Sequence, residues 1–562
     1  MMELLDEISE ATSPEDVERT AQSVAGGEAV GQLDPFRLFG VYANLMDPRR
    51  VAREAPRTMA ELVKVAMGTS KVAPGARDAR FADPAWSEHP LYRRLMQAYL
   101  VWAESVERVA SAEDGDWRDE ARARYATAFV TSTLAPTNVL LGNPAALKRA
   151  FDTAGASLAQ GTLNMLRDLR DNGGMPSMVD TEPFKVGENL AATPGAVVYR
   201  DEICEVLQYA PSTTSVHARP LLMVPPQINK HYFLDLAPGR SMVEYLVGRG
   251  VNYFTIVWRN PRPEHGHWGM EDYVEAQLRA VDVVCDVAGR EDLNVLGACA
   301  GGLTTGLMLG HLAHQGDERV KAATYMISML DTRFPNILAM MATDRLESRL
   351  QEDAEAGKVY DRKDVARTFA WMRPNDLVFN YVVNNWLMGK DPPAFDILAW
   401  NDDSTNLSAR FDRDMLDIFA HNRAARPGGV TVLGSPIDLR KVTCDTYVVA
   451  GKTDHITPWQ PCYMTTQLVG GPSEVVVTST GHIQTIVNPP GKPRARYYAG
   501  PEPGPDPEAW MAAADEHQGS WWPRYADWLL ERSGPARRPR AKLGSRKYPA
   551  RDPAPGRYVH ES

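Results

Sequence analysis

The short stretch Gly297–Gly302 (Gly-Ala-Cys-Ala-Gly-Gly) limits the fold of this chain more than any other segment. It directly follows the apolar run Leu293–Leu296 and has the form Gly-x-nucleophile-x-Gly, with cysteine in the centre. Such a stretch is typical of a sharp turn from a buried strand into a helix, where glycines allow strand and helix to approach closely. The helix dipole favours the thiolate of a cysteine at a helix N-terminus. Cys299 is therefore a candidate nucleophile, although a cysteine in an apolar stretch is commonly an inert core residue.

Two later segments contain the partners that such a nucleophile requires. Asp454 follows the apolar run Tyr447–Ala450, and His482 follows the run Glu474–Val477. Both residues are expected just beyond the C-terminal ends of strands, where catalytic groups gather in parallel sheets. The order nucleophile, acid, histidine is that of α/β-hydrolases. We therefore predict that Cys299, Asp454 and His482 form a catalytic triad.

Two backbone N–H groups are expected to stabilise an oxyanion. In this fold one donor is the residue after the nucleophile, here Ala300, and the other lies in a loop after an earlier strand. The stretch Leu221–Lys230 reads as that strand and loop. Its two prolines have no N–H, so the second donor is Gln227, Ile228 or Asn229, and we favour Ile228. The alternative is that Pro-Pro merely ends the strand.

The remaining histidines are weaker candidates for the base. His455 adjoins Asp454, and side chains of neighbouring residues point away from each other. His231 lies close to the predicted oxyanion loop, which keeps it a candidate. The others have no comparable setting and are interpreted as surface or structural residues: His89, His217, His265, His267, His311, His314, His421, His517 and His560.

Composition and charge exclude several classes of protein. The 562 residues are 44% hydrophobic and 24% charged, as in ordinary globular proteins, and are enough for two or more domains. The net charge of −11 argues against a dedicated nucleic-acid-binding protein. The N-terminal residues lack the apolar core of a signal peptide, and no apolar run approaches the roughly 20 residues that span a bilayer.

Cysteine usage points to a reducing compartment. The five cysteines are scattered and have no metal-type spacing: Cys204, Cys285, Cys299, Cys444 and Cys462. This pattern predicts free thiols in the cytoplasm and no metal site. Phosphate-binding glycine-rich loops of the known nucleotide-binding types are also missing from the sequence.

The chain is expected to have a helical first part and an α/β second part. Residues 1–190 carry helical patterns, with a turn-rich junction at Asp171–Pro176. In residues 191–562 strand-like and helical runs alternate, which predicts a mostly parallel sheet covered on both faces. We therefore predict an α/β-hydrolase fold preceded by a mainly helical domain. The expected helices of the first part are Met59–Ala66, Pro90–Ala110 and Pro144–Leu169. The expected strands are Ala196–Tyr199 and Ile203–Tyr209 as a hairpin, then Leu221–Val224, Tyr253–Val257, Leu293–Leu296, Ala322–Ile327, Asp445–Ala450 and Glu474–Val477.

Two segments depart from the alternating pattern. Residues 331–427 are helical and irregular and lie between the nucleophile and the acid, where hydrolase-fold enzymes carry a lid that excludes water. A surface for a second subunit is an equally good interpretation. Residues 534–562 contain a basic run, usually a solvated tail; contact with an anionic surface or coenzyme phosphates is the alternative.

Longer segments resemble those of polyhydroxyalkanoate synthases over nearly the whole chain. Besides the Gly297–Gly302 turn, the resemblance rests on Pro225–Lys230, Trp258–Pro261, Arg373–Leu377, Asp454–Trp459, Gly481–Gln484 and Asn488–Pro490. The segments most similar to class II synthases, single-polypeptide enzymes associated with medium-chain monomers, are Asp83–Ser87, Leu296–Ala300 and Tyr558–Glu561. Ala300 stands where class II synthases commonly have Ser, and Phe379 stands where Trp is usual. Neither is a catalytic group, although Ala300 adjoins the nucleophile and bears on monomer preference.

The resemblance implies that the chain polymerises (R)-3-hydroxyacyl-CoA into polyhydroxyalkanoate and releases CoA. Cys299 would carry the acyl chain as a thioester, and His482 would accept the thiol proton and activate the 3-hydroxyl of the next unit. Asp454 would either orient His482 or act directly on that hydroxyl. The resemblance implies no metal or redox cofactor. Its implied partners are the cytoplasmic polyhydroxyalkanoate granule and a second copy of the chain, both contacted by the N-terminal region.

Two other functions are compatible with the same residues. A cysteine ester hydrolase, such as an intracellular depolymerase of the same polymer, would use the triad but release free hydroxy acid. A catalytically idle granule-coating protein would use only the N-terminal helices and the basic segment. The preferred monomer length has no sequence signature, since one methylene changes binding by only about 1–3 kcal/mol.

Overall fold

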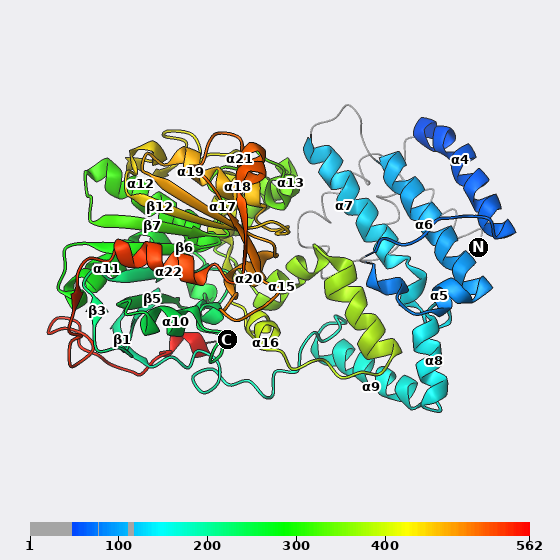
Figure 1. Ribbon diagram of the computed structural model, residues 1–562, viewed down its shortest axis with the longest axis horizontal. Coiled ribbons are helices and arrows are strands. Elements are labelled where there is room, and N and C mark those ends of the chain that lie inside the picture. The colour runs from blue at the N-terminus through cyan, green and yellow to red at the C-terminus, as the bar shows by residue number, and fades with distance from the viewer. Residues whose placement is uncertain (1–47, 77, 111–116, 562) are drawn as a thin grey trace. The chain divides into compact units, whose positions relative to one another are not determined.

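The computed structural model describes residues 48–76, 78–110 and 117–561, which belong to two compact units (Figure 1). The first unit contains the described residues up to Asp180 together with Lys363–Phe395. The second unit contains Thr181–Arg362 and the described residues from Asp396 onward. The first boundary therefore lies at Asp180, near the end of the helical region expected over residues 1–190.

The first unit is helical, as predicted. Its main helices are α4 (Pro48–Met67), α5 (Ala85–Glu88), α6 (Pro90–Ala110), α7 (Trp117–Thr133), α8 (Pro144–Asp152) and α9 (Ala156–Asp171). Helix α6 packs against α4 and α7, and a small core forms around Trp86 and Tyr99. The run predicted over Pro144–Leu169 is two helices, because Ala154 and Gly155 adopt left-handed φ values of 49° and 87°.

The middle of the predicted lid belongs to this first unit. Lys363–Phe395 contains most of α15 (Arg362–Trp371) and two π-helical segments, η6 (Asn375–Phe379) and η7 (Val382–Leu387). Segment η7 crosses α9 so closely that a Cβ on Gly161 would clash with the Trp386 carbonyl oxygen. Trp386 Nε1 also donates to Asp168 at 2.7 Å. Residues 331–427 are therefore not one body, since their two outer parts lie in the second unit.

A ten-stranded sheet forms the centre of the second unit, in the order β1-β2-β5-β4-β6-β7-β12-β13-β14-β15. The six strands from β5 to β13 in this order run parallel, and antiparallel strands extend the sheet at both edges. The strands are β1 (Gly195–Arg200), β2 (Cys204–Tyr209), β4 (Leu221–Val224), β5 (Tyr253–Trp258), β6 (Leu293–Ala298), β7 (Val320–Met326), β12 (Asp445–Gly451), β13 (Ser473–Thr478), β14 (Arg496–Ala499) and β15 (Asp515–Gln518). All eight predicted strands are confirmed. Strands β14 and β15 are not among the predicted ones: each has only four residues, and β15 (Asp-Glu-His-Gln) is entirely polar.

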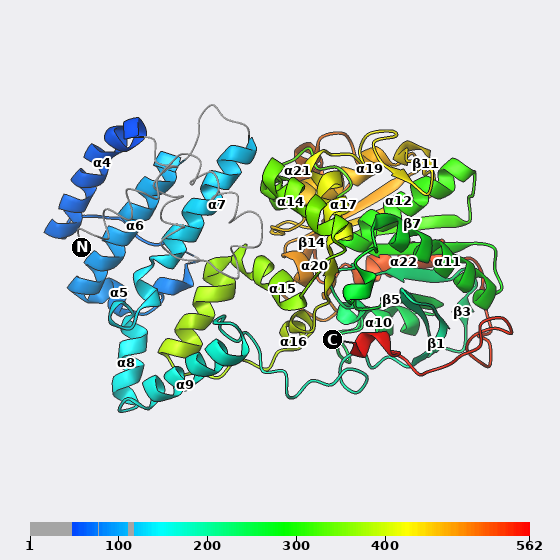
Figure 2. The same cartoon turned by 180° about the vertical axis from the view of Figure 1, so that it is seen from behind.

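Helices cover both faces of this sheet (Figures 1 and 2). On one face α22 (Trp522–Glu531) packs against α10 (Met242–Gly248), where the rings of Trp522 and Tyr245 are 5.6 Å apart. On the other face α11 (Met270–Ala288) packs against α12 (Ala300–Gln315) and α17 (Ala409–Ala420). The two-sided, mostly parallel sheet is the arrangement predicted from the sequence.

Shorter elements complete the second unit. Its further helices are α13 (Ile337–Met341), α14 (Asp344–Glu355), α16 (Asp396–Asp402), α18 (Trp459–Tyr463), α19 (Thr465–Leu468), α20 (His482–Ile486) and α21 (Pro507–Ala513). Its two-stranded pairs are β3 (Val216–His217) with β16 (Ala536–Arg537), β8 (Val359–Tyr360) with β9 (Leu407–Ser408), and β10 (Thr431–Val432) with β11 (Ser435–Pro436). No helix in the described ranges is long and apolar enough to cross a membrane.

The basic C-terminal segment is not a free tail, because it belongs to the second unit, although most of its basic side chains are exposed to solvent as expected. Strand β16 pairs with β3. Arg537 and Arg540 donate to carbonyl oxygens at the end of α11, at 2.8 and 2.6 Å. Tyr558 and Val559 are buried. The segment therefore follows the surface of the α/β unit and buries Tyr558 and Val559 in it, whereas the next residue, His560, is exposed.

Candidate active site

Cys299 lies in the turn between β6 and α12, as predicted. Its backbone has φ 50° and ψ −123°, a conformation that residues other than glycine rarely adopt. A Cβ on Gly301 would clash with the Val224 carbonyl oxygen, and one on Gly302 would clash with Ser328. The glycines therefore let α12 start directly against the sheet. This packing holds the thiol at the C-terminal edge of the parallel strands.

The side chains of Asp454 and His482 meet beyond the ends of β12 and β13. His482 Nδ1 lies 2.7 Å from Asp454 Oδ2. The fully buried Asp454 carboxylate also accepts the backbone N–H groups of Ile456 and Thr457, at 2.9 and 3.0 Å. The Thr457 hydroxyl donates to Asp454 Oδ2 at 2.9 Å and lies 3.2 Å from His482 Nδ1. These contacts fix the carboxylate, which in turn orients the imidazole ring.

The charges of this pair stabilise each other. Burial alone would lower the pKa of His482, but the Asp454 carboxylate, and next the neighbouring Cys299 side chain, raise this pKa above its ordinary value. Burial would raise the pKa of Asp454, whereas His482 and the hydrogen bonds from Thr457 lower it. The structure thus brings the three predicted triad residues together, and the imidazole is a stronger base than a free histidine.

Neither alternative histidine takes the place of His482. Asp454 Oδ2, the oxygen that orients the catalytic base, is bound to His482. His455, the chain neighbour of Asp454, is therefore not the base. His231 lies in the 3-10 helix His231–Phe233 and is 2% exposed. Burial, and next the charge of Lys230, lower the pKa of His231 to about 3. His231 is therefore uncharged at neutral pH.

The two predicted oxyanion donors lie on segments next to this turn. Ala300 is the first residue of α12, where helix N–H groups have no acceptor within the helix. The loop Pro225–Lys230 follows β4, and within it Gln227 Nε2 donates to Thr304 Oγ1 of α12 at 3.1 Å. This contact holds the loop that carries Ile228 against the helix that begins at the nucleophile. Donation to an oxyanion by Ala300 and Ile228 stays a prediction.

Two supporting residues are missing from the sequence-based prediction. Thr457 contacts both members of the acid–histidine pair. Its signal is the spacing Asp454-x-x-Thr457, because Asp side chains commonly accept N–H groups two or three residues further along. The Ser328 hydroxyl donates to the Cys299 carbonyl oxygen at 2.9 Å. Ser328 follows a different strand, and no short-range pattern predicts this contact.

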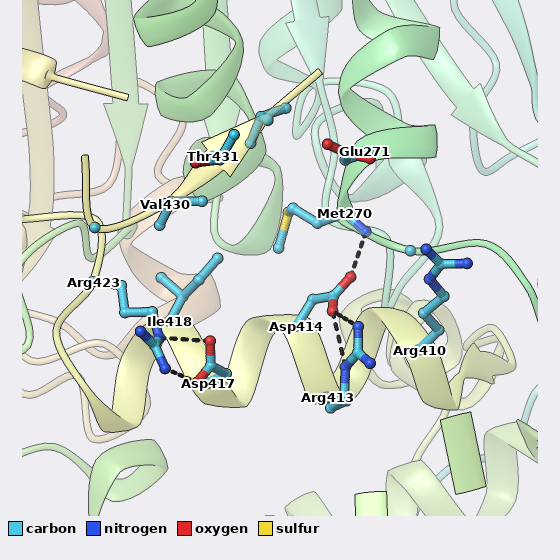
Figure 3. Close-up of a pocket in the computed structure, with 13 residues that line it drawn as sticks. Met270, Glu271, Arg410, Arg413, Asp414, Asp417, Ile418, Arg423, Val430 and Thr431 are labelled. Carbon is cyan, nitrogen blue, oxygen red and sulfur yellow. Dashed lines mark hydrogen bonds and ion pairs between the residues drawn. The ribbon is translucent and has the colours of Figure 1, made fainter. Parts of the chain in front are cut away.

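A separate cavity of about 330 Å³ lies between α17 and the start of α11 (Figure 3). Four of its six charged side chains form ion pairs: Arg423 binds Asp417 at 2.6 Å, and Asp414 binds Arg413 and also accepts the Met270 N–H. None of the predicted site residues lines this cavity. In the described part of the chain, no group of three or more His, Cys, Asp or Glu residues is arranged to hold a metal ion. The expectation of a metal-free reaction stays a prediction.

A strained cysteine after a central parallel strand, with a buried carboxylate–imidazole pair beyond two later strands, defines an α/β-hydrolase-fold protein with cysteine at the nucleophile position. The family model for the alpha/beta hydrolase fold matches residues 236–489. A second model, for the N-terminus of poly-beta-hydroxybutyrate polymerase (PhaC), matches residues 77–246. The chain belongs to the family of poly(3-hydroxyalkanoate) polymerases.

Curated relatives agree with this assignment over most of their length. Poly(3-hydroxyalkanoate) polymerases 1 and 2 of Ectopseudomonas oleovorans are each 46% identical to this chain, over 92% of it and 92% of their own length. The poly(3-hydroxyalkanoate) polymerase subunit PhaC of Cupriavidus necator is 38% identical, over 88% of this chain and 85% of its own. The resemblance found in the sequence motifs is therefore confirmed, and the relatives are enzymes.

Proposed function

We propose that this chain is an acyltransferase that polymerises (R)-3-hydroxyacyl-CoA into polyhydroxyalkanoate with release of CoA. The names of its relatives support polymerisation of hydroxyalkanoates. The observation that carries the proposal is the position of Cys299, in a strained turn beside a histidine held by a buried carboxylate. The reaction needs no metal or redox cofactor, because a CoA thioester is already activated for acyl transfer.

The first half-reaction loads the enzyme. His482 accepts the proton of the Cys299 thiol, and the sulfur attacks the thioester carbonyl carbon. The oxyanion that forms is stabilised by the N–H groups of Ala300 and Ile228. The intermediate collapses by breaking the carbon–sulfur bond to CoA. The CoA sulfur leaves with the proton from His482, and the acyl group stays on Cys299 as a thioester.

The second half-reaction lengthens the chain. His482 accepts the proton of the 3-hydroxyl of an acyl unit, and the hydroxyl oxygen attacks the Cys299 thioester. An oxygen ester forms, and the Cys299 sulfur leaves with the proton from His482. The Asp454 carboxylate is hydrogen-bonded to His482 Nδ1, which supports an orienting role for Asp454 in both steps. Water must be excluded while the thioester persists, a role proposed for the parts of the predicted lid that belong to the second unit, residues 331–362 and 396–427.

A product analysis separates this function from a cysteine ester hydrolase of the same fold. Incubation of the purified chain with (R)-3-hydroxyoctanoyl-CoA is expected to release CoA and to form an insoluble polyester. A depolymerase or other hydrolase would release soluble hydroxy acid alone, and that result would reject the proposal. A granule-coating protein without catalysis would release no CoA above the blank.

Loss of the Thr457 hydroxyl should weaken catalysis without removing a reacting group. Thr457→Val removes a hydrogen bond to a charged carboxylate, and kcat is expected to fall about 10-fold. Thr457→Ser keeps the hydroxyl and is expected to keep most of the activity. The hydroxyl lowers the pKa of Asp454, so its loss raises that pKa. The acidic limb of the pH–rate profile therefore moves to higher pH, since Asp454 is protonated sooner as the pH falls. An unchanged profile in Thr457→Val would contradict this role.

The helical unit is proposed to contact the polyester granule and a second copy of the chain. All fourteen large hydrophobic side chains that are exposed among the described residues belong to this unit. Several follow one helix at three- or four-residue spacing, such as Met59, Val63 and Met67 on α4 and Leu163, Leu166 and Leu169 on α9. Exposed apolar surface of this extent marks an interaction site, and the surface of a polyester granule is apolar. The granule also implies a cytoplasmic location.

Attachment and pairing can be measured separately from catalysis. The triple variant Leu163→Gln/Leu166→Gln/Leu169→Gln is expected to sediment with granules several-fold less than the wild type. Its CoA release per soluble enzyme should stay within about 2-fold, because α9 contributes no triad residue. Undiminished granule binding would exclude this face of α9 as the contact. For pairing, sedimentation velocity in the presence of substrate is expected to reveal a dimer, and a monomer alone would reject it.

A further inference from the structure

A buried lysine lies two residues after Ile228, in the loop proposed to supply the second oxyanion donor. The Lys230 side chain is 5% exposed. Its ammonium group donates to Asp403 Oδ1 at 2.6 Å and to the Val559 carbonyl oxygen at 2.7 Å. Lysine is rarely buried, because removing its charge from water is costly unless the charge is paired and hydrogen-bonded. An apolar residue would fill the same space without this cost, so the contacts of Lys230 call for an explanation.

Helix α16 and the residues just after it hold the same loop at further points. Trp400 Nε1 donates to the Lys230 carbonyl oxygen at 2.8 Å, and Thr405 Oγ1 donates to the Gln227 carbonyl oxygen at 3.1 Å. Asp403 also accepts the Tyr232 hydroxyl at 2.8 Å. These contacts lie on both sides of Ile228 in the sequence. The residues between Trp400 and Thr405, which the sequence assigned to a lid, therefore fasten the loop to the α/β unit.

The carbonyl oxygen that Lys230 binds is itself fixed. Val559 belongs to the C-terminal segment, whose backbone N–H groups at Arg557 and Tyr558 both donate to the Glu205 carboxylate of β2 at 3.0 Å. Two residues later, Glu561 pairs with Arg259 at 3.1 Å, just after β5. Lys230 thus joins the loop to a segment that is anchored on two strands of the main sheet.

We propose that Lys230 is a positioning residue for the acyl-transfer reaction: its link to Asp403 and Val559 holds the loop Pro225–Lys230 so that the Ile228 N–H points at the developing oxyanion. This inference rests on the proposed function of Cys299. It also implies that the C-terminal segment helps to position the loop, since this segment contains the Val559 carbonyl oxygen that Lys230 binds. Oxyanion donors act only when they are already in place, and a misplacement of about 1 Å can cost 10²-fold in rate.

Two reactions of Cys299 separate positioning from general structural support. Attack on a CoA thioester passes through an oxyanion and needs the loop. Alkylation by iodoacetamide displaces iodide from carbon, forms no oxyanion, and needs only the activated thiol. In Lys230→Met, kcat for CoA release is expected to fall about 10- to 100-fold with KM within about 3-fold. Alkylation of the Cys299 peptide, followed by mass spectrometry, should stay within about 2-fold of the wild type. The matched control is Lys441→Met, which removes an exposed lysine of the same unit.

The outcomes are distinct. If CoA release and alkylation fall together in Lys230→Met, or if neither falls, Lys230 is not a positioning residue. Where Lys230→Met does not fold, Glu561→Gln decides the question, because it loosens the C-terminal anchor away from the loop. A lower kcat with unchanged alkylation then supports the inference, and an unchanged kcat overturns it. Failure of the proposed function itself appears in the wild type, as CoA release that persists after Cys299 is fully alkylated.

Discussion

Replacing Cys299 with alanine is expected to reduce CoA release from (R)-3-hydroxyacyl-CoA by about 10⁴-fold or more, the size of loss found when a covalent nucleophile is removed. The reason is that no acyl-enzyme can form. The residual rate would come only from binding and the oxyanion donors. The measurement is the initial rate of thiol release in a colorimetric assay, together with the polyester that accumulates in cells.

The matched control is Cys285→Ala. Cys285 is partly exposed on α11 in the same unit, and burial raises the pKa of its thiol to about 11, so it is a poor nucleophile at neutral pH. This variant should keep most of the activity. Polymer accumulation at the wild-type level in Cys299→Ala would remove Cys299 from the reaction.

A loss of similar size, about 10⁴-fold, is expected for His482→Gln, because the same imidazole moves protons in both half-reactions. Glutamine keeps a hydrogen-bonding group near Asp454 but cannot accept a proton. Alkylation of Cys299 by iodoacetamide should also slow in this variant, since the thiol loses its base. Both expectations are tested by measuring the rate of CoA release and the rate of Cys299 alkylation on the same preparation of His482→Gln.

His455→Gln is the control for this change. His455 adjoins Asp454 in the chain, but the Asp454 carboxylate is directed at His482 Nδ1, so His455→Gln should retain activity within a few-fold. If His455→Gln were the inactive variant and His482→Gln the active one, the assignment of the base would be reversed.

The sequence was sufficient to predict the core of the second unit and its reactive groups. Runs such as Leu293–Leu296 and Tyr447–Ala450 consist mainly of apolar and β-branched residues, and such runs identify buried parallel strands. The residues that follow such strands must share one edge of the sheet, so Cys299, Asp454 and His482 were predicted to lie close together. The glycines around Cys299 also carry a local signal, because only glycine permits the close approach of α12 to β6.

Contacts between distant segments could not be predicted in this way. Gly161 on α9 lacks a side chain and so permits close packing of η7, which lies more than 200 residues further along the chain. Because of this packing, the middle of the predicted lid belongs to the helical unit. The contact of Lys230 with the Val559 carbonyl oxygen spans 329 residues. The hydrogen bonds from Arg537 and Arg540 to carbonyl oxygens at the end of α11 also could not be predicted, because a run of charged residues does not indicate which distant carbonyl oxygens accept from it.

The most direct test is to identify the atom that carries the acyl group. Mass spectrometry after brief incubation with one equivalent of (R)-3-hydroxyacyl-CoA is expected to find one hydroxyacyl unit on the peptide that contains Cys299, with an equal amount of CoA released. Further substrate should move this unit into polymer. An acyl group on any other residue, or CoA release with free hydroxy acid and an unmodified Cys299, would contradict the mechanism.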